Sequence, residues 1–318
     1  MNQDNKNPTS NILKNGITEE EIIKAITLSG YPLQTEIVSN LVNFLKCEEE
    51  WSYIDRYSNE LRSLDIFAQE PLYDFEKNKC PLIKPNLTLL IECKKSELPF
   101  VFFLSNKNLS KQSYPLTTGL EYELFKAKIQ SSNIVFETKI TKILELDNEE
   151  FINNIPTSLT FSKSSRSGKG IVLSGNEAYQ NIVLPLISAY SYFESKTKPS
   201  SNAVAFNCHL TFLIAVIDAP LIGVSYNGNN QNLTLLPWIR LIRNESSENG
   251  LKSYPIDIIH KDFFKTYLND SIIEYAKLFG KKIKENQELL YEGEGFSQTI
   301  SQAIKNSFSK QKKRIIEG

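Results

Sequence analysis

The sequence predicts a mixed α/β core, and three observations support that fold class. A capping-box pair, Thr18 and Glu21, precedes one segment with helical apolar periodicity, and Pro32 opens a second such segment. Residues 87–93 (LTLLIEC) then form an apolar run without a polar face, which is typical of a strand buried on both sides. Helices followed by a run of strands indicate a sheet against which helices pack.

The remaining elements follow from the same periodicities. The predicted strands are residues 51–57, 61–67, 87–93, 100–104, 134–141, 210–217, 221–226, 233–242 and 256–259. Two further helices are expected, over about residues 176–194 and from about residue 261 past residue 275. Residues 164–170 (SSRSGKG) are interpreted as a flexible basic connector, since their spacing does not match a phosphate-binding P-loop.

The expected domain organisation is one elaborated domain with two polar ends. Residues 1–16 are predicted to be a flexible N-terminus, residues 17–290 the domain with an insertion at about 105–165, and residues 291–318 a basic C-terminal tail. No segment reaches the ~18 consecutive apolar residues of a membrane helix, and the first residues lack the apolar run of a signal peptide. A cytoplasmic protein without membrane contact is therefore expected.

Charge and cysteine content narrow the function classes. The 36 Lys and Arg nearly balance the 37 Asp and Glu, giving a net charge of -1. A dedicated nucleic-acid coat protein is usually far more basic, although balance does not exclude a local basic groove. The four cysteines lack zinc-ligand spacing, which indicates reduced thiols; they are Cys47, Cys80, Cys93 and Cys208.

The chemistry is expected where acidic residues interrupt apolar strands. Asp65 stands between apolar neighbours, and Glu92 closes the buried strand of residues 87–93. A carboxylate in such a place is costly unless a positive charge compensates it. Strand alternation puts Lys94 on the face of Glu92. Two carboxylates with an ammonium suit a Mg²⁺ ion, which takes one or two carboxylates and can assist the attack of water on a phosphodiester.

The same residues stand in a pattern that resembles the PD-(D/E)xK nuclease superfamily. Asp65 is followed, after a Pro-containing loop, by Glu92-Cys93-Lys94. The flanking segments are similar to those of restriction-endonuclease-like bacterial proteins; they are residues 30–36 (GYPLQTE), 62–66 (RSLDI) and 92–103 (ECKKSELPFVFF). The resemblance covers residues 16–105 well and continues more loosely through the helix at Tyr179 and Gln180 and the strands near Ile217 and Ile256.

The resemblance implies a restriction-endonuclease-like core, a mixed sheet flanked by helices, with insertions and a C-terminal helical tail. It also implies that Asp65 and Glu92 bind Mg²⁺, with Mn²⁺ as a substitute, and that Lys94 is catalytic. The carbonyl of Cys93 is the implied further metal ligand. Glu36 resembles the helix-borne acid that assists metal or water binding. The implied function is a Mg²⁺-dependent endonuclease, acting on DNA rather than RNA in bacterial restriction or anti-phage defence.

Three alternatives remain open from the sequence. The chain could be a catalytically silent, nuclease-like subunit that binds nucleic acid or takes part in an assembly. It could also be an unrelated α/β enzyme or scaffold with a fortuitous motif, in which Asp65 and Glu92 lie far apart. Finally, Asp65 and Glu92 could be structural, each paired with Arg62, Lys94 or Lys95 at a strand end. A homodimer or a defence-system partner protein is compatible with the sequence, and neither is indicated by a specific motif.

Overall fold

The computed structural model describes residues 8–56, 58–73, 81–105, 115–122, 124–130, 132, 134–228, 230–247 and 250–297. The predictions for Tyr57, for Cys80 and for most of the basic tail lie outside these residues. Within them, no helix is long and apolar enough to cross a membrane, and Cys47, Cys93 and Cys208 are free thiols.

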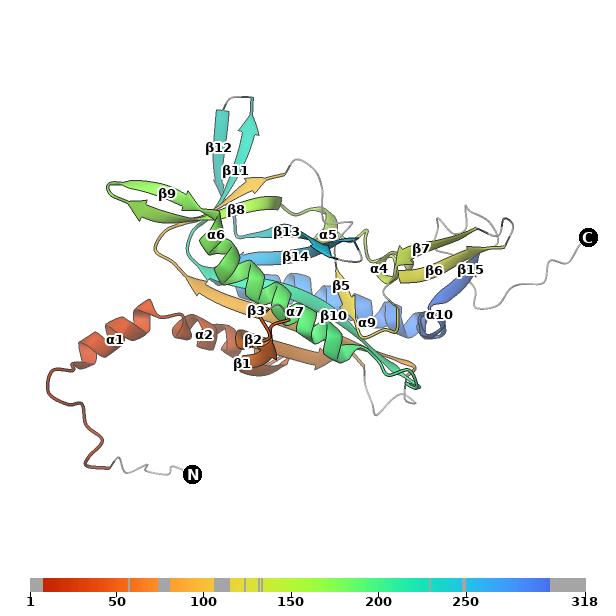
Figure 1. Ribbon diagram of the computed structural model, residues 1–318, viewed down its shortest axis with the longest axis horizontal. Helices are drawn as coiled ribbons and strands as arrows, with labels where there is room; N and C mark the ends of the chain where they lie inside the picture. The colour runs from red at the N-terminus through yellow and green to blue at the C-terminus, as the bar shows by residue number, and fades with distance from the viewer. Residues whose placement is uncertain are drawn as a thin grey trace, which may run out of the picture.

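A large mixed sheet organises the fold, which confirms the α/β class (Figure 1). Its described strands follow the order β1-β2-β3-β10-β14-β13-β8-β4-β11-β12, with β5 added to β10 and β9 to β8. The strands are β1 (Lys46–Ile54), β2 (Leu61–Pro71), β3 (Ile83–Lys95), β4 (Phe100–Leu104), β5 (Leu116–Thr118), β8 (Thr157–Ser167), β9 (Gly170–Ser174), β10 (Phe206–Asp218), β11 (Leu221–Asn227), β12 (Asn230–Leu235), β13 (Trp238–Ser247) and β14 (Gly250–His260). At the centre, β3 runs parallel to β10 along its whole length and antiparallel to β2.

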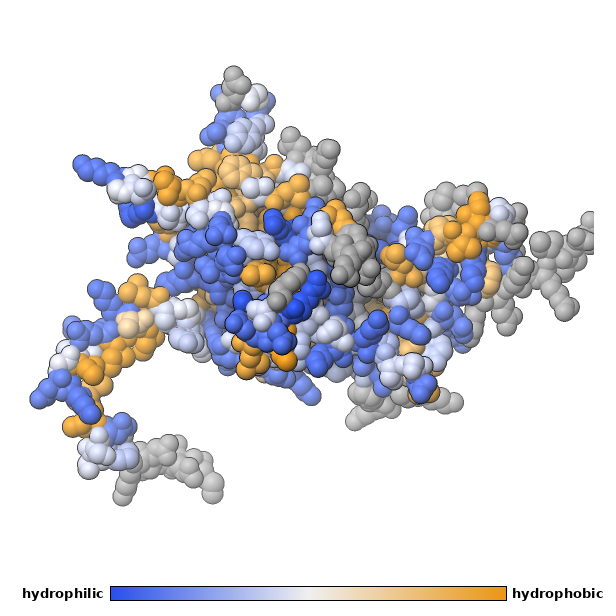
Figure 2. Space-filling model, viewed as in Figure 1, coloured by the Kyte–Doolittle hydropathy of each residue, from blue (hydrophilic) through white to orange (hydrophobic). Residues whose placement is uncertain are grey.

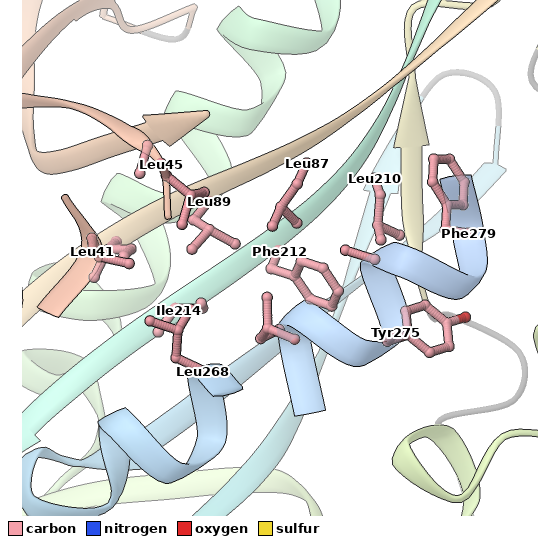
Figure 3. Packing of buried hydrophobic residues seen from close by; sticks show 14 of the residues in the cluster. Leu41, Leu45, Leu87, Leu89, Leu210, Phe212, Ile214, Leu268, Tyr275 and Phe279 are labelled. Atoms are coloured by element: carbon pink, nitrogen blue, oxygen red, sulfur yellow. The ribbon is translucent and has the colours of Figure 1, made fainter. Parts of the chain in front are cut away.

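Helices cover both faces of this sheet. The helical elements are α1 (Glu19–Leu28), α2 (Tyr31–Leu41), α4 (Ile140–Ile143), α5 (Glu150–Asn153), α6 (Gly175–Ala178), the π-helix η1 (Tyr179–Val183), α7 (Leu184–Thr197), the 3-10 helix η2 (Lys261–Phe263), α8 (Phe264–Tyr267), the π-helix η3 (Leu268–Ile273), α9 (Glu274–Glu285) and α10 (Gln287–Glu292). One core joins α2, α8 and α9 to the first face, where Phe212 and Phe279 pack among leucines (Figure 3). A second core joins α7 to the opposite face. Residues 87–93 are consequently buried on both sides, as their composition predicts.

The predicted insertion and the start of the predicted tail form a small second sheet. Its order is β15-β6-β7, with β6 at Leu124–Ile129, β7 at Val135–Lys139 and β15 at Glu294–Ser297. β15 pairs in parallel with β6 across a long sequence separation. Residues 294–297 therefore pack with the insertion and do not extend away from the domain.

Two segments differ from the sequence-based prediction. Residues 164–170 are not a connector: β8 and β9 form an antiparallel hairpin whose turn contains Gly168 with a φ of +59°. The polar composition concealed the hairpin, since among the paired residues 163–167 and 170–174 the apolar ones come only in β9. Residues 233–242, predicted as one strand, are divided between β12 and β13, because Pro237 interrupts the run.

Candidate active site

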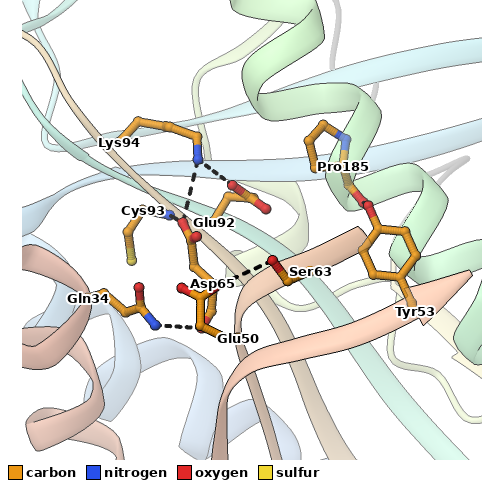
Figure 4. A network of polar contacts seen from close by, with 9 residues as sticks. All are labelled: Gln34, Glu50, Tyr53, Ser63, Asp65, Glu92, Cys93, Lys94 and Pro185. Carbon is orange, nitrogen blue, oxygen red and sulfur yellow. Dashed lines mark hydrogen bonds and ion pairs between the residues drawn. The ribbon is translucent and has the colours of Figure 1, made fainter. Parts of the chain in front are cut away.

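The site begins where the pairing between β2 and β3 stops. The last paired residues are Ile66 and Ile91, and beyond them Asp65 leaves the ladder. Its Oδ2 accepts a hydrogen bond from the backbone N–H of Cys93 at 2.6 Å, so a side chain replaces the missing ladder bond (Figure 4). The backbone of Asp65 is held as well, because Gln34 Nε2 on α2 donates to its carbonyl at 3.0 Å. Asp65 is thus fixed by two neighbouring elements.

Lys94 links the two acids. Its Nζ lies 2.5 Å from Glu92 Oε2 and 3.5 Å from Asp65 Oδ2. Both distances end at one atom, which places the two carboxylate oxygens within about 6 Å of each other. The structure therefore brings Asp65, Glu92 and Lys94 together, as the sequence pattern predicts. The alternative in which Asp65 and Glu92 lie far apart is wrong.

Glu92 carries the strongest electrostatic perturbation of the group. The residue is only 3% exposed. Burial raises the pKa of its carboxyl to about 8, and the nearby Asp65 adds to the rise while Lys94 opposes it. Burial lowers the pKa of Lys94, but Glu92 and Asp65 outweigh burial, so that the net pKa of Lys94 is raised. One ammonium therefore does not supply all the positive charge that this pair of carboxylates needs.

A cleft of about 390 Å³ opens beside these residues. Its lining comes from the N-terminal helices, from within β1 and β2 and from the end of β3: Leu28, Gly30, Tyr31, Gln34, Glu50, Asp65, Cys93, Lys94 and Lys95. Lys95 donates from Nζ to the carbonyl of Thr27 at 2.8 Å, which ties the end of α1 to the rim of the cleft. The cleft leaves Lys94 accessible, with 31% of its side chain exposed.

The structure does not bring Glu36 into this group. Glu36 lies on the exposed side of α2, away from the cleft lining. Gln34 takes that place, because it lies three residues before Ile37 on the buried face of the helix. This helical spacing is the signal by which Gln34 could have been found.

Glu50 is the second cleft residue that sequence reasoning missed. It lies in β1 opposite Asp65, where the ladder between Glu49–Ile66 and Trp51–Leu64 omits one pair. Its φ of +50° is a left-handed conformation that costs a non-glycine residue of order 1–3 kcal/mol. Its carboxylate accepts a hydrogen bond from Ser63 Oγ at 3.1 Å. The place of Glu50 in the cleft follows from the register of β1 on β2, which the sequence alone does not show.

The donor set fits Mg²⁺ better than zinc. Across the described part of the chain, no three His, Cys, Asp or Glu side chains converge closely enough to hold a metal ion. Zinc sites take three or four such ligands, whereas Mg²⁺ takes one or two carboxylates and keeps several waters. Asp65 and Glu92 supply two carboxylates, whose oxygens lie within about 6 Å of each other. Cys93, whose carbonyl the resemblance implies as a further ligand, belongs to the cleft lining.

Three further polar side chains, Gln180, Tyr179 and His209, are not in the cleft lining. Gln180 is exposed, and Tyr179 donates to Glu245 under the guanidinium of Arg243. His209 is buried next to Thr88 and Gln69 in the sheet. Comparison of the chain with protein-family models, with curated proteins and with solved structures gave no match in any of the three.

Proposed function

We propose that the protein is a Mg²⁺-dependent nuclease with a restriction-endonuclease-like core. The observation that carries the proposal is the convergence of Asp65 and Glu92 on the ammonium of Lys94 at the end of a buried strand. Buried carboxylates are costly, and a perturbed group in an open cleft is a candidate for function rather than for stability. The cleft gives a substrate access to Asp65 and Lys94, which line it, and Glu92 lies buried behind Lys94 at 2.5 Å from its Nζ.

Each residue has its own task in this proposal. Asp65, held by the Cys93 N–H and by Gln34, is a fixed acid, and Glu92 is the acid whose charge is least compensated. When bound, Mg²⁺ supplies Lewis acidity, lowering the pKa of a bound water and neutralising phosphate charge. Lys94, whose side chain is 31% exposed, orients the attacking water or stabilises negative charge that develops on the phosphate.

The proposed substrate is DNA, and the proposed setting is bacterial restriction or anti-phage defence. The support is the resemblance of residues 30–36, 62–66 and 92–103 to restriction-endonuclease-like proteins. Lys94 and Lys95, both in the cleft lining, are the cations placed to contact a phosphate backbone.

The test compares Lys94→Ala with a matched lysine. Lys128 has a similarly exposed side chain (32%) and also pairs with a carboxylate, Glu294, at 2.7 Å, but it lies in the small second sheet (Figure 1). Plasmid DNA and single-stranded RNA are incubated with each variant in Mg²⁺, Mn²⁺ or EDTA. We expect metal-dependent cutting of DNA that Lys94→Ala reduces at least about 100-fold and Lys128→Ala leaves unchanged.

The same experiment separates the alternative function. If folded wild type cuts neither substrate, isothermal titration with Mg²⁺ is the deciding measurement. Binding that Asp65→Asn abolishes would favour a nuclease-like subunit that binds nucleic acid or takes part in an assembly without cutting. Absence of both cutting and Mg²⁺ binding would contradict the proposal.

A further inference from the structure

Helix α1 presents an apolar stripe that the described residues do not cover. Ile22, Ile23 and Ile26 recur at helical spacing, and Ile26 remains 52% exposed. None of the ten residues of α1 is buried. A helix this short is marginal in water without packing of its apolar face, even with the capping box formed by Thr18 and Glu21. The stripe therefore requires a covering surface.

Among the described residues, the contacts that tie α1 to the cleft rim lie near its C-terminal end. Lys95 donates to the carbonyl of Thr27, and Leu28 lines the catalytic cleft. Figure 1 shows the rest of α1 projecting from the body, and Figure 2 shows hydrophobic colour along this arm. The apolar stripe is consequently available to another molecule.

The hairpin β8–β9 presents a second exposed apolar surface with the opposite charge. Ile171 and Leu173 lie on one face of β9, and Leu173 is 49% exposed. Arg166 lies directly across from Ile171 in the pairing register, and Lys169 lies in the turn. Both cations are exposed. In Figure 1 this hairpin is a separate arm on the same side of the molecule as α1.

The two surfaces are complementary. On α1, Glu19 and Glu20 occupy the first turn beside the isoleucine stripe. On the hairpin, Arg166 and Lys169 accompany Ile171 and Leu173. An acidic apolar helix is repelled by nucleic acid and by anionic membranes, whereas a basic apolar hairpin suits it.

We propose that α1 of each copy packs on the β8–β9 hairpin of a second copy, forming a symmetric homodimer. A two-fold axis makes both contacts at once, because each chain supplies one helix and one hairpin. Since α1 borders the cleft, the dimer sets the hairpin of one copy beside the cleft rim of the other. The inference stands on exposure and charge alone and does not require nuclease activity.

Sedimentation velocity of the full chain, without metal or nucleic acid, tests the proposal. Wild type is expected to be dimeric over about a hundredfold concentration range. The double variant Ile23→Asp with Ile26→Asp, and separately Leu173→Asp, should each raise the dissociation constant at least tenfold. Leu233→Asp is the control, because Leu233 is a still more exposed residue on the neighbouring hairpin β11–β12. Circular dichroism verifies that every variant is folded.

Charge exchange identifies the contact itself. Arg166→Glu should weaken the dimer, and so should the double variant Glu19→Lys with Glu20→Lys. Combining all three changes should lower the dissociation constant at least tenfold relative to either of these variants. A monomeric wild type overturns the proposal. So does a dimer that is indifferent to the α1 and hairpin variants, or one that loses as much affinity with Leu233→Asp.

Discussion

Replacing Glu92 by glutamine should stabilise the protein in the absence of metal. Glutamine has almost the same shape as glutamate but never carries the charge that burial makes costly. Lys94 keeps a partner, because Asp65 Oδ2 lies 3.5 Å from its Nζ, and its side chain reaches solvent. A residue kept for binding a cation should therefore cost stability when the cation is absent.

The magnitude follows from the raised pKa. The pKa of Glu92 rises from 4.5 to about 8 on folding, so between these values the folded state holds a proton that the unfolded state releases. Stability is therefore lost as the pH rises through this window. At pH 7 the cost is about 3 kcal/mol, and at pH 5 it is below about 1 kcal/mol. The gain of Glu92→Gln over wild type should follow the same pH dependence.

Urea unfolding with EDTA, followed by tryptophan fluorescence, measures the difference. Asp257→Asn is the matched comparison, because Asp257 is also buried but forms a two-pronged ion pair with Arg240 at 2.6 and 2.9 Å. Its removal leaves a buried guanidinium uncompensated and should cost about 3 to 5 kcal/mol. If Glu92→Gln were destabilising by more than about 1 kcal/mol at pH 7, Glu92 would be a structural partner of Lys94 and the reasoning would be refuted.

Three further outcomes are expected. Mg²⁺ at ten times its dissociation constant should stabilise wild type by about 1.4 kcal/mol and leave Asp65→Asn unchanged in thermal melts; equal stabilisation of both would place the ion elsewhere. Burial lowers the pKa of His209 from 6.5 to about 4, so the unfolded state alone gains a proton as the pH falls, and urea unfolding should show a loss of about 2 kcal/mol between pH 7 and pH 4.5 that His209→Gln lacks. Gly119→Ala should cost more than about 2 kcal/mol, since φ is +88° and the added Cβ would collide with the carbonyl of Asn207, whereas Gly168→Ala, at +59° with open space around it, should cost only about 1 kcal/mol in the same assay.

Local patterns predicted the centre of the fold well. The capping box is formed by Thr18 and Glu21 as expected, and residues 87–93 are buried on both faces. Both features depend on neighbours in sequence or on burial alone. The pairing of β15 with β6 could not be predicted, because it joins residues more than a hundred positions apart and carries no local signal. The β8–β9 hairpin was missed since serine and basic residues hide its alternation.

Local patterns likewise predicted some residues of the candidate site and missed others. Asp65, Glu92 and Lys94 could be identified because charged residues inside apolar strands are expensive and their spacing places them on defined faces. Glu50 reaches the cleft only through the register of β1 on β2 and a left-handed backbone at that residue. On α2, Gln34 faces the cleft and Glu36 faces solvent. The position of a residue around the helix therefore predicts which side chain reaches the site better than its acidic character does.

The hydrogen bond from the Cys93 N–H to Asp65 has a consequence for how such a site can vary. It anchors the acid to the neighbouring strand, and the Ile66–Ile91 pair sets the alignment of the two strands. The geometry of the acids is therefore independent of how many residues join β2 to β3. Insertions or deletions between Leu72 and Leu82 would change the spacing of the motif along the chain while leaving its atoms in place. Proteins with the same constellation could thus differ widely in motif spacing, and alignment of three-dimensional positions would detect them more readily than alignment of sequences.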